Sequence, residues 1–438
     1  MKRSISFTII TTFVTAIFVG TLLLMLPFST TGSSISFEDA LFTSTSAVTV
    51  TGLIVLDTNE DFTRFGKIVI LVLIQLGGLG FMTFSTLAIL LIGKSISISD
   101  KMLLENDFSS GNKKNIRDMI KKIILLTFGF ELTGSIVLFF NFANLNLSER
   151  IFSSVFHSIS AFCNAGFSIF TNNFENYITD PVINSTLSIL IISGGIGFLV
   201  LNEIYLFISR KKSISKFSLH SKLVLITSFI LIITGFVIIL AEQFINSNNS
   251  LSVGEKIYTS LFHSVSARTA GFNTINLNYF SLGSVFILLI LMFIGASPGS
   301  TGGGVKTSSA GMVIMYFRSK LKGMDKTSLF YRTIPKDNIE KAFIMIIISF
   351  LLISLSFLLI LTFENELGFM DLLFETVSAF GTVGLSLGVT SKLALSSKFV
   401  IIITMFIGRI GPLTLLLAMS KKESKAVYNY PEENIMIG

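Results

Sequence analysis

One short pattern occurs four times in this chain and constrains the fold more than any other feature. The copies are ALFTSTSAVTVTGL, SVFHSISAFCNAGF, SLFHSVSARTAGF and LLFETVSAFGTVGL, and they begin at Ala40, Ser154, Ser260 and Leu372. In each copy a Phe stands four residues before a Ser-Ala pair, and a Gly follows that pair; the glycines are Gly52, Gly166, Gly271 and Gly384. Repetition at near-constant spacing indicates one structural unit used four times. Four units around an axis are what one chain needs to enclose a pore.

The composition is that of an integral membrane protein. Of 438 residues, 51% are hydrophobic and 13% are charged, about half the charged share of soluble domains. Apolar stretches long enough to span a bilayer, about 20 residues, occur near 6–28, 66–92, 121–142, 182–209, 221–245, 281–316, 340–363 and 397–419. Each copy of the repeated pattern lies between two of them and is too short and polar to cross. Such a segment is tolerated in lipid as a re-entrant loop that is buried or lines a wet cavity.

These features predict an all-α integral membrane protein. Its eight transmembrane helices form four span–pore-helix–span repeats around a pseudo-fourfold axis, with re-entrant filter loops. The predicted repeats are 1–93, 94–209 with a basic cytoplasmic loop, 210–319 with an intramembrane gate loop, and 320–438 with a C-terminal tail. The first stretch reads as a retained span, because it is long for a signal peptide and no small-residue cleavage site follows it.

The basic residues predict the orientation in the membrane. The segments that join one repeat to the next, and the two ends of the chain, carry most of the 33 Lys and Arg, whereas the segments that hold the repeated pattern are acidic. By the positive-inside rule, both termini and the inter-repeat loops are cytoplasmic. The net charge of +7 is therefore a topology signal and does not indicate nucleic-acid binding. The single cysteine, Cys163, excludes an intramolecular disulfide.

The repeated pattern can hold a cation. Its first half is compatible with a helix whose partly negative C-terminus points into the membrane, and its glycine allows carbonyls to face an axis. Rings of carbonyls replace the hydration shell of K⁺. The predicted filter residues are Thr49, Val50, Thr51, Gly52, Asn164, Ala165, Gly166, Thr269, Ala270, Gly271, Thr382, Val383 and Gly384, with K⁺ at the four glycines. The alternative is that these glycines only permit close helix packing; their common register argues against it.

A glycine cluster follows each predicted filter strip, at 77–80, 194–197, 295–304 and 408–411. The first two predict close helix packing. The third, GASPGSTGGG, is long enough to interrupt its helix, and we expect it alone to form a broken span with a flexible gate loop at 296–306. The predicted gate residues are Gly299, Ser300, Thr301, Gly302, Gly303, Gly304, Lys306 and Arg409. A phosphate-binding loop is disfavoured, because Val305 separates Gly304 from Lys306 and no β-strand precedes the segment.

Several polar side chains at membrane depth leave alternative readings open. Arg409 anchors the gate loop through carbonyls, or lowers cation occupancy below the filter, or pairs with an acid; Lys306 either acts in the gate or extends to the cytoplasm. Arg268 is expected to bond to nearby carbonyls or to Glu375. The side chains at one equivalent position of each copy are expected to tie the pore helices together by hydrogen bonds; they are Thr43, His157, His263 and Glu375.

As a set, the four copies, the GASPGSTGGGVKT break and the GRIGPLTL segment resemble the Trk/Ktr/HKT superfamily of potassium transporters, over nearly the whole chain. Within it the chain is most similar to the KtrB membrane subunits. This resemblance implies a K⁺-translocating subunit of the bacterial cytoplasmic membrane, often promoted by Na⁺, with no organic cofactor in this chain. It also implies a homodimer in membrane lipid that docks on a cytoplasmic KtrA-like nucleotide-binding ring.

The resemblance also bears on selectivity. Relatives that prefer Na⁺ carry serine at the first filter glycine, whereas this chain has Gly52, which favours K⁺. Cys163, before Asn164, departs from the polar amide that is frequent in the family. The competing readings are a Na⁺-permeable or weakly selective transporter of the same architecture, and a membrane enzyme or substrate-coupled carrier. The sequence offers no catalytic constellation, so we expect no enzyme.

Overall fold

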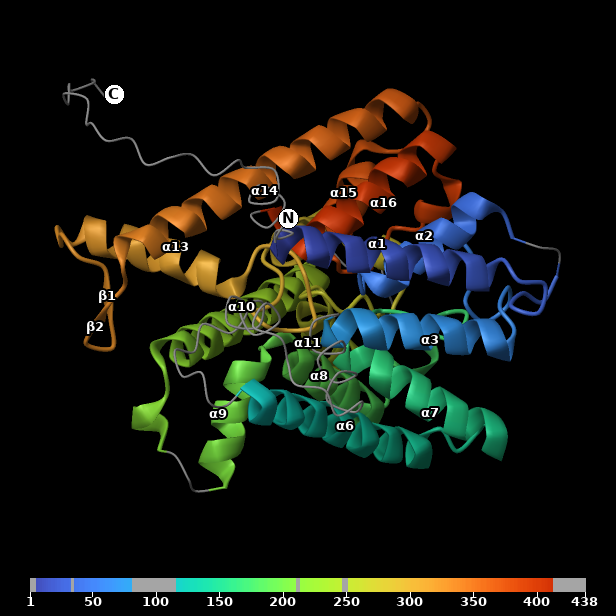
Figure 1. Cartoon of the computed structure of the whole chain (residues 1–438), viewed down its shortest axis with the longest axis horizontal. Coiled ribbons are helices and arrows are strands. Elements are labelled where there is room, and N and C mark those ends of the chain that lie inside the picture. Colours follow the sequence, from blue (N-terminus) through green and yellow to red (C-terminus); the bar gives the residue numbers. More distant parts are fainter. Residues whose placement is uncertain (1–4, 33–34, 81–115, 210–212, 246–250, 413–438) are drawn as a thin grey trace.

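The computed structural model describes residues 5–32, 35–80, 116–209, 213–245 and 251–412 (Figure 1). In these residues the chain is helical apart from one short hairpin, β1 (Ser328–Leu329) and β2 (Arg332–Thr333). The helices come in four successive groups of the same order: a long helix, a short helix that contains the repeated pattern, and a second helix.

The helices of the four groups have the following bounds. The long, short and second helices are α1 (Ile5–Leu24), α2 (Phe37–Val48) and α3 (Arg64–Leu79); α6 (Ile116–Asn141), α7 (Leu147–Phe162) and α8 (Pro181–Gly195); α10 (Leu219–Ile245), α11 (Val253–Ser266) and α12 (Leu282–Phe293); and α14 (Lys336–Phe363), α15 (Phe369–Gly381) and α16 (Leu395–Ile410). Helix α9 (Phe198–Ile208) follows α8, and α13 (Thr307–Leu321) follows α12. Single 3₁₀ turns lie at Glu175–Tyr177, Ile214–Lys216, Leu277–Tyr279 and Thr390–Lys392.

Each short helix begins with the same local signal. A capping residue is followed three positions later by an acid in the first helical turn; the pairs are Ser36 and Asp39, Asn146 and Glu149, Ser252 and Glu255, and Gly368 and Asp371. In the first three pairs the cap side chain accepts from the backbone N–H of the acid. Caps and acids at this end satisfy free N–H groups and complement the helix dipole. The repeat therefore extends upstream of the pattern that the sequence analysis used.

The four groups close into a ring. Each second helix packs on the short helix of the next group: α3 on α7, α8 on α11, α12 on α15, and α16 on α2. Figure 1 shows the last group, in red, beside the first group, in blue. A salt bridge of 2.8 Å between Lys398 of α16 and Asp39 of α2 joins the last group to the first.

Within a group, the repeated side chains explain the packing. The four repeated phenylalanines are at most 2% exposed; they are Phe42, Phe156, Phe262 and Phe374. In the first three groups a serine of the short helix donates to a carbonyl of the long helix at 2.6–2.7 Å, and a glycine three residues further along the long helix faces that serine. These glycines, Gly20, Gly134 and Gly235, leave no room for a Cβ. In the fourth group the equivalent hydroxyl, Thr376, bonds within its own helix.

The predicted spans are only partly continuous. Among the residues that the structure describes, three helices are long and apolar enough to cross a membrane: Lys121–Asn141 within α6, Leu219–Ile245 and Lys336–Phe363. The pair α8 and α9 would make a fourth span, but it bends by 112° at its break. The predicted stretch 281–316 is divided between α12 and α13, and the ends of 66–92 and 397–419 lie outside the described residues.

The expectation that only the third group has a broken second helix is wrong. Helices α8 and α9 are separated by Ile196 and Gly197 and bend by 112° there, so the second group is also broken. Gly197 and the residues that cap α3 and α16, Gly80 and Gly411, share one conformation: for Gly80, Gly197 and Gly411 φ is 75°, 92° and 89° and ψ is 134°, 142° and 136°. A positive φ of this kind is open to glycine and strained for other residues. The clusters that sequence analysis read as packing glycines therefore also end their helices.

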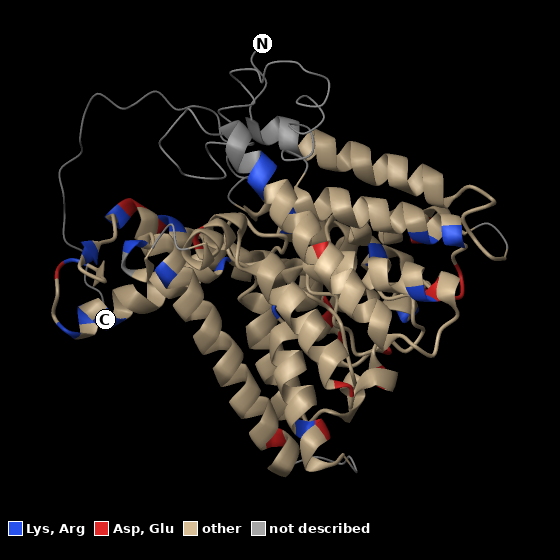
Figure 2. Ribbon diagram, turned by 90° about the horizontal axis from the view of Figure 1, so that it is seen from below, with Lys and Arg blue, Asp and Glu red and all other residues tan. Residues whose placement is uncertain are grey.

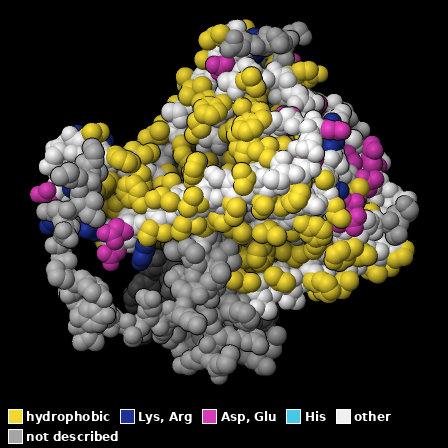
Figure 3. All heavy atoms as spheres, turned by 90° about the horizontal axis from the view of Figure 1, so that it is seen from above, with side chains coloured by type: hydrophobic (Ala, Val, Ile, Leu, Met, Phe, Trp, Pro, Cys, Tyr) yellow, Lys and Arg dark blue, Asp and Glu magenta, His cyan; other side chains and the backbone are white. Residues whose placement is uncertain are grey.

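The surface agrees with a membrane environment. Figure 2 shows charged residues mainly toward the ends of the helices, with uncharged ribbon between them. Figure 3 shows a face covered largely by hydrophobic side chains. On helix α14, for example, at least 56% of the surface of each of four large apolar residues is exposed; they are Phe350, Leu351, Leu355 and Leu358. Apolar side chains exposed along a whole helix indicate contact with lipid rather than with water.

Candidate functional site

The strips that follow the four short helices share one backbone shape. The glycines have φ of 90°, 71°, 76° and 90° in chain order, and the residue two positions before each glycine also has a positive φ. Those residues are Val50 (57°), Asn164 (58°), Thr269 (71°) and Thr382 (50°). Non-glycine residues rarely adopt this conformation. Because this conformation occurs at the same position of all four strips, strips of different sequence share one backbone conformation.

The repeated serine holds the strip in place. In every group its carbonyl accepts from the backbone N–H of the residue before the glycine, at 2.8–2.9 Å. The hydroxyls of Ser46 and Ser378 accept from the N–H of Gly52 and Gly384, at 3.0 and 3.1 Å. Those of Ser160 and Ser266 donate instead to the carbonyl after the glycine, at 2.8 and 2.5 Å. The serine of the pattern is therefore a clamp between short helix and strip.

The four glycines meet in a closed ring. A Cβ on each glycine would overlap the carbonyl oxygen of the residue that precedes the next glycine: Gly52 meets Ala165, Gly166 meets Ala270, Gly271 meets Val383, and Gly384 meets Thr51. The last contact returns to the first strip. The four strips therefore lie edge to edge around one point, and only glycine fits at these positions.

One cavity of about 220 Å³ lies against this ring and is lined by all four glycines. Two carboxylic acids, Asp57 and Glu175, also line it, together with the amides of Asn172, Asn173 and Asn273. Asn273 Nδ2 donates to Glu175 Oε1 at 3.4 Å, and partial burial raises the pKa of Glu175 above its ordinary value. Sequence reasoning missed both acids, because neither lies in the repeated pattern.

The loop between α12 and α13 contacts the strips directly. With the Asn164 amide oriented to satisfy both of its ends, Nδ2 donates to Thr301 Oγ1 at 3.1 Å, and Oδ1 accepts from Thr269 Oγ1 at 3.3 Å. Gly303 N donates to Thr382 Oγ1 at 2.9 Å. Residues 301–305 are buried. A Cβ on Gly302 would overlap Thr269 Oγ1. The loop thus reaches three residues that carry a positive φ, one in each of the last three strips.

Backbone hydrogen bonds hold this loop to helices α8 and α16. Ser297 N and Thr301 N donate to the carbonyls of Gly195 and Gly194, at 3.0 and 3.2 Å. Gly304 N donates to the carbonyl of Gly408 at 3.4 Å. The sequence predicted a flexible segment, but the structure shows one fixed by bonds to the second and fourth groups.

Both cations near the loop bond to carbonyls. Arg409 donates from one guanidinium nitrogen to Thr301 O and from the other to Gly77 O in α3. This geometry matches the anchoring alternative for Arg409, since both of these acceptors are carbonyls. Lys306 Nζ donates to Gly302 O at 2.9 Å, within the loop itself. Together with the bonds above, Arg409 connects the loop to the first group.

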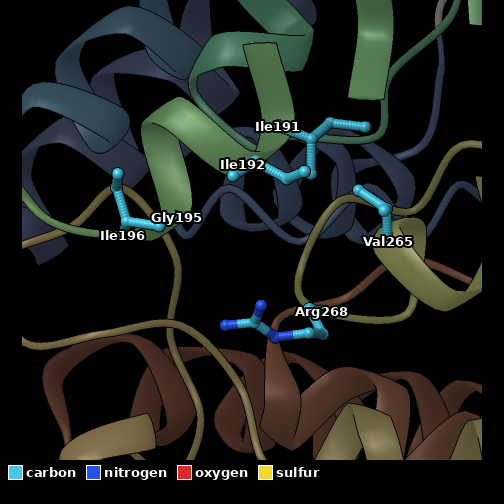
Figure 4. Close-up of a pocket in the computed structure, with 6 residues that line it drawn as sticks. All are labelled: Ile191, Ile192, Gly195, Ile196, Val265 and Arg268. Carbon is cyan, nitrogen blue, oxygen red and sulfur yellow. The ribbon is translucent and has the colours of Figure 1, made fainter. Parts of the chain in front are cut away.

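Arg268 lies at a small cavity behind the third strip (Figure 4). Its guanidinium is 6% exposed and donates to the hydroxyl and carbonyl of Ser228, at 3.1 and 3.5 Å. The cavity is lined by Ile191, Ile192, Gly195, Ile196 and Val265 as well. The carbonyl alternative predicted for Arg268 thus matches the structure, whereas the Glu375 alternative is wrong.

The side chains expected to join the pore helices to one another act within their own groups. His157 bonds to Ser153 O at 2.8 Å and to Ser168 Oγ at 3.0 Å, and Glu375 accepts from Ser386 and Thr390. Each of these links runs within one helix or to the segment that leaves the strip. His263 bonds to Thr259 O in its own helix at 2.9 Å. The prediction of links between pore helices is therefore wrong for these residues, because their reach is local.

Comparison with known proteins places the chain in a family. Residues 2–430 match the family described as TrkH, cation transport protein. The chain is 38% identical to the Ktr system potassium uptake protein B of Bacillus subtilis (strain 168), covering 97% of this chain and 95% of that protein. It is 36% identical to the protein of the same name from Vibrio alginolyticus, over 98% and 94%. It is 34% identical to the potassium/sodium uptake protein NtpJ of Enterococcus hirae, over 97% and 95%.

A solved structure supports the fold. The potassium transporter TrkH from Vibrio parahaemolyticus superposes with a TM-score of 0.75 at 19% identity, covering 96% of this chain and 86% of that one. At this identity the likeness concerns the fold alone. It agrees with an all-α membrane transporter.

Proposed function

The chain belongs to the TrkH family of cation transport proteins, and from that premise we propose that it carries K⁺ across the cytoplasmic membrane through one gated pore. Like its relatives, it is a transporter and not an enzyme. The relatives named potassium uptake protein support K⁺ as the transported ion. We propose that the four groups of helices, bounded at 1–93, 94–209, 210–319 and 320–438, are pore repeats with eight spans in all.

The closed glycine ring carries this proposal. Each of the four short helices ends next to a strip of the ring, so four partly negative helix ends converge there. Carbonyl oxygens at the contacts between strips can replace the water around a K⁺ ion. The filter then consists of Thr49–Gly52, Asn164–Gly166, Thr269–Gly271 and Thr382–Gly384. The cavity with Asp57 and Glu175 is the outer mouth through which the ion reaches it.

The loop at 296–306 is the gate in this proposal. Its contacts with Asn164, Thr269 and Thr382 support this role, because they bring the loop against three of the four filter strips. Arg409 holds the loop by Thr301 O and the first group by Gly77 O. Breaking these bonds frees the loop to leave the path. Gly299, Ser300, Gly302, Gly304 and Lys306 supply its turns and internal bonds.

The relatives are named as parts of a Ktr system, which supports an assembly with further subunits. We extend this to a homodimer that docks on a KtrA-like nucleotide-binding ring at the cytoplasmic side, with both termini on that side. Na⁺ acts in this scheme as an activator.

Na⁺ permeation is the second candidate, because NtpJ is named for potassium and sodium uptake. Gly52 stands where relatives that prefer Na⁺ carry serine, and this difference favours K⁺ in our proposal; Gly52 has the same φ as Gly384 of the fourth group. A serine at position 52 would be strained at this φ, and its Cβ would overlap the carbonyl oxygen of Ala165. Uptake of labelled Na⁺ at limiting K⁺ separates the two candidates.

Growth at low K⁺ of a bacterium that lacks its own K⁺ uptake tests the function. We expect the chain to restore growth, and G271S, which places a side chain into the ring, to lose it. Tracer uptake into proteoliposomes gives the same comparison without cellular partners. No rescue by a well-expressed chain, or rescue by G271S equal to that of the unaltered chain, would refute the proposal.

A further inference from the structure

A buried carboxylic acid lies in α6, outside the ring and its gate. Glu131 is 4% exposed, and its Oε1 accepts from Nε2 of Gln75 in α3 at 2.9 Å. The two residues belong to neighbouring groups of helices. An acid in the middle of an apolar span is costly unless it is paired, and such residues are usually functional.

The hydrogen bonds continue from this acid toward the ring. Gln75 Oε1 accepts from the thiol of Cys163 at 3.6 Å. Cys163 is completely buried, caps the end of α7 and directly precedes Asn164, the first left-handed residue of the second strip. A Cβ on Gly78 would overlap the Cys163 side chain, so α3 also fixes it by contact. The chain of bonds therefore ends at the residue directly before the second strip.

Two further contacts tie the same parts together. The backbone carbonyl of Glu131 accepts from Ser158 Oγ of α7 at 2.6 Å. Arg409 donates to Gly77 O, in the same turn of α3 as Gln75. The acid is thus joined to α7 at both its backbone and, through Gln75, its side chain.

We propose that Glu131 is a positioning residue for the second strip and acts through Gln75 and Cys163. Glu131 Oε1 accepts from the NH₂ end of the Gln75 amide, and a carboxyl oxygen in this position requires that end to face it. The amide oxygen is then turned toward the thiol, which fixes Cys163 and the start of the strip. This inference rests on the proposed function of the ring as a K⁺ filter.

The test compares K⁺ and Na⁺ tracer uptake by the full chain in proteoliposomes. We expect Q75L and C163A to lower the K⁺/Na⁺ uptake ratio about tenfold, which corresponds to 1.4 kcal/mol. Q243L is the matched control: Gln243 is 3% exposed in the span α10, and within the described part of the chain no residue forms a hydrogen bond with its amide. A role in folding alone would lower both fluxes together and leave the ratio unchanged.

A reversed pair sharpens the test. E131Q alone leaves the Gln75 amide free to turn, so we expect the K⁺/Na⁺ uptake ratio to fall. In the double variant E131Q/Q75E an amide again donates to a carboxylate, with the two groups exchanged between positions 131 and 75. We therefore expect the double variant to recover the uptake ratio. A Q75L ratio equal to those of Q243L and the unaltered chain would overturn the inference. A double variant that melts like the unaltered chain but does not recover the ratio would also overturn it. Absence of K⁺ uptake by the unaltered chain would instead overturn the proposed function, and this inference with it.

Discussion

Replacing Gly271 by alanine separates two costs at the ring. Gly271 has a φ of +76°, which costs another residue about 1–2 kcal/mol. The added Cβ would also lie 3.1 and 3.2 Å from the Cα atoms of Gly384 and Gly166, and nearer still to the carbonyl oxygen of Val383. Carbon atoms in favourable contact are about 3.5–4.0 Å apart. Two neighbouring strips must therefore withdraw, and the Val383 carbonyl must turn away.

Gly388 provides the control. Its φ is +84°, but a Cβ there would meet nothing within 4 Å. G271A and G388A therefore share the backbone strain and differ in the overlap. We expect G388A to lower the melting temperature in detergent with little change in the K⁺/Na⁺ uptake ratio. We expect G271A to lower that ratio at least about tenfold, the equivalent of 1.4 kcal/mol from one disturbed carbonyl. Equal ratios in two folded variants would refute the assignment of the ring as a filter.

Three further predictions concern the gate loop, the cavity beside the filter, and the salt bridge between the first and last groups of helices. R409Q removes the charged donor to Thr301 O, and we expect higher K⁺ flux in proteoliposomes; unchanged flux would contradict the gate. Burial raises the pKa of Glu175, so its carboxylate is neutralised at a higher pH than usual; the apparent K⁺ affinity should fall on acidification, and E175Q should lose that dependence. K398M leaves Asp39 unpaired where the two side chains are 15% and 21% exposed, which should cost about 1–3 kcal/mol, seen as a lower melting temperature that K398D/D39K partly restores.

The repeated pattern could be read from the sequence because it combines local and global requirements. The Phe fills a core position, the Ser clamps the strip, and the Gly lets four strips meet. Each requirement fixes a residue type at a fixed offset, so it leaves a visible repeat. The caps upstream, such as Ser36 with Asp39, form an equally regular signal that a search centred on glycine overlooks.

Other features could not be derived because they depend on contacts far apart in the chain. The partner of Arg268 is Ser228, a residue without any motif, and the partners of Arg409 are carbonyls. Carbonyl acceptors leave no trace in a sequence. The two acids that line the cavity, Asp57 and Glu175, could not be derived either, because their role follows from the position of the cavity and not from a pattern of residues.

The breaks in the second helices change the explanation of the gate. Gly80, Gly197 and Gly411 take the same backbone conformation, and the second group has a break between α8 and α9 as the third has between α12 and α13, so a break cannot by itself distinguish the third group. Between α8 and α9 the break consists of Ile196 and Gly197, whereas between α12 and α13 it extends from 294 to 306. The third group therefore differs by the length and polarity of the segment inserted into a shared break. Because the inserted segment bonds to Gly194, Gly195 and Gly408, helices α8 and α16 serve as its supports, and a change in either of them should alter gating.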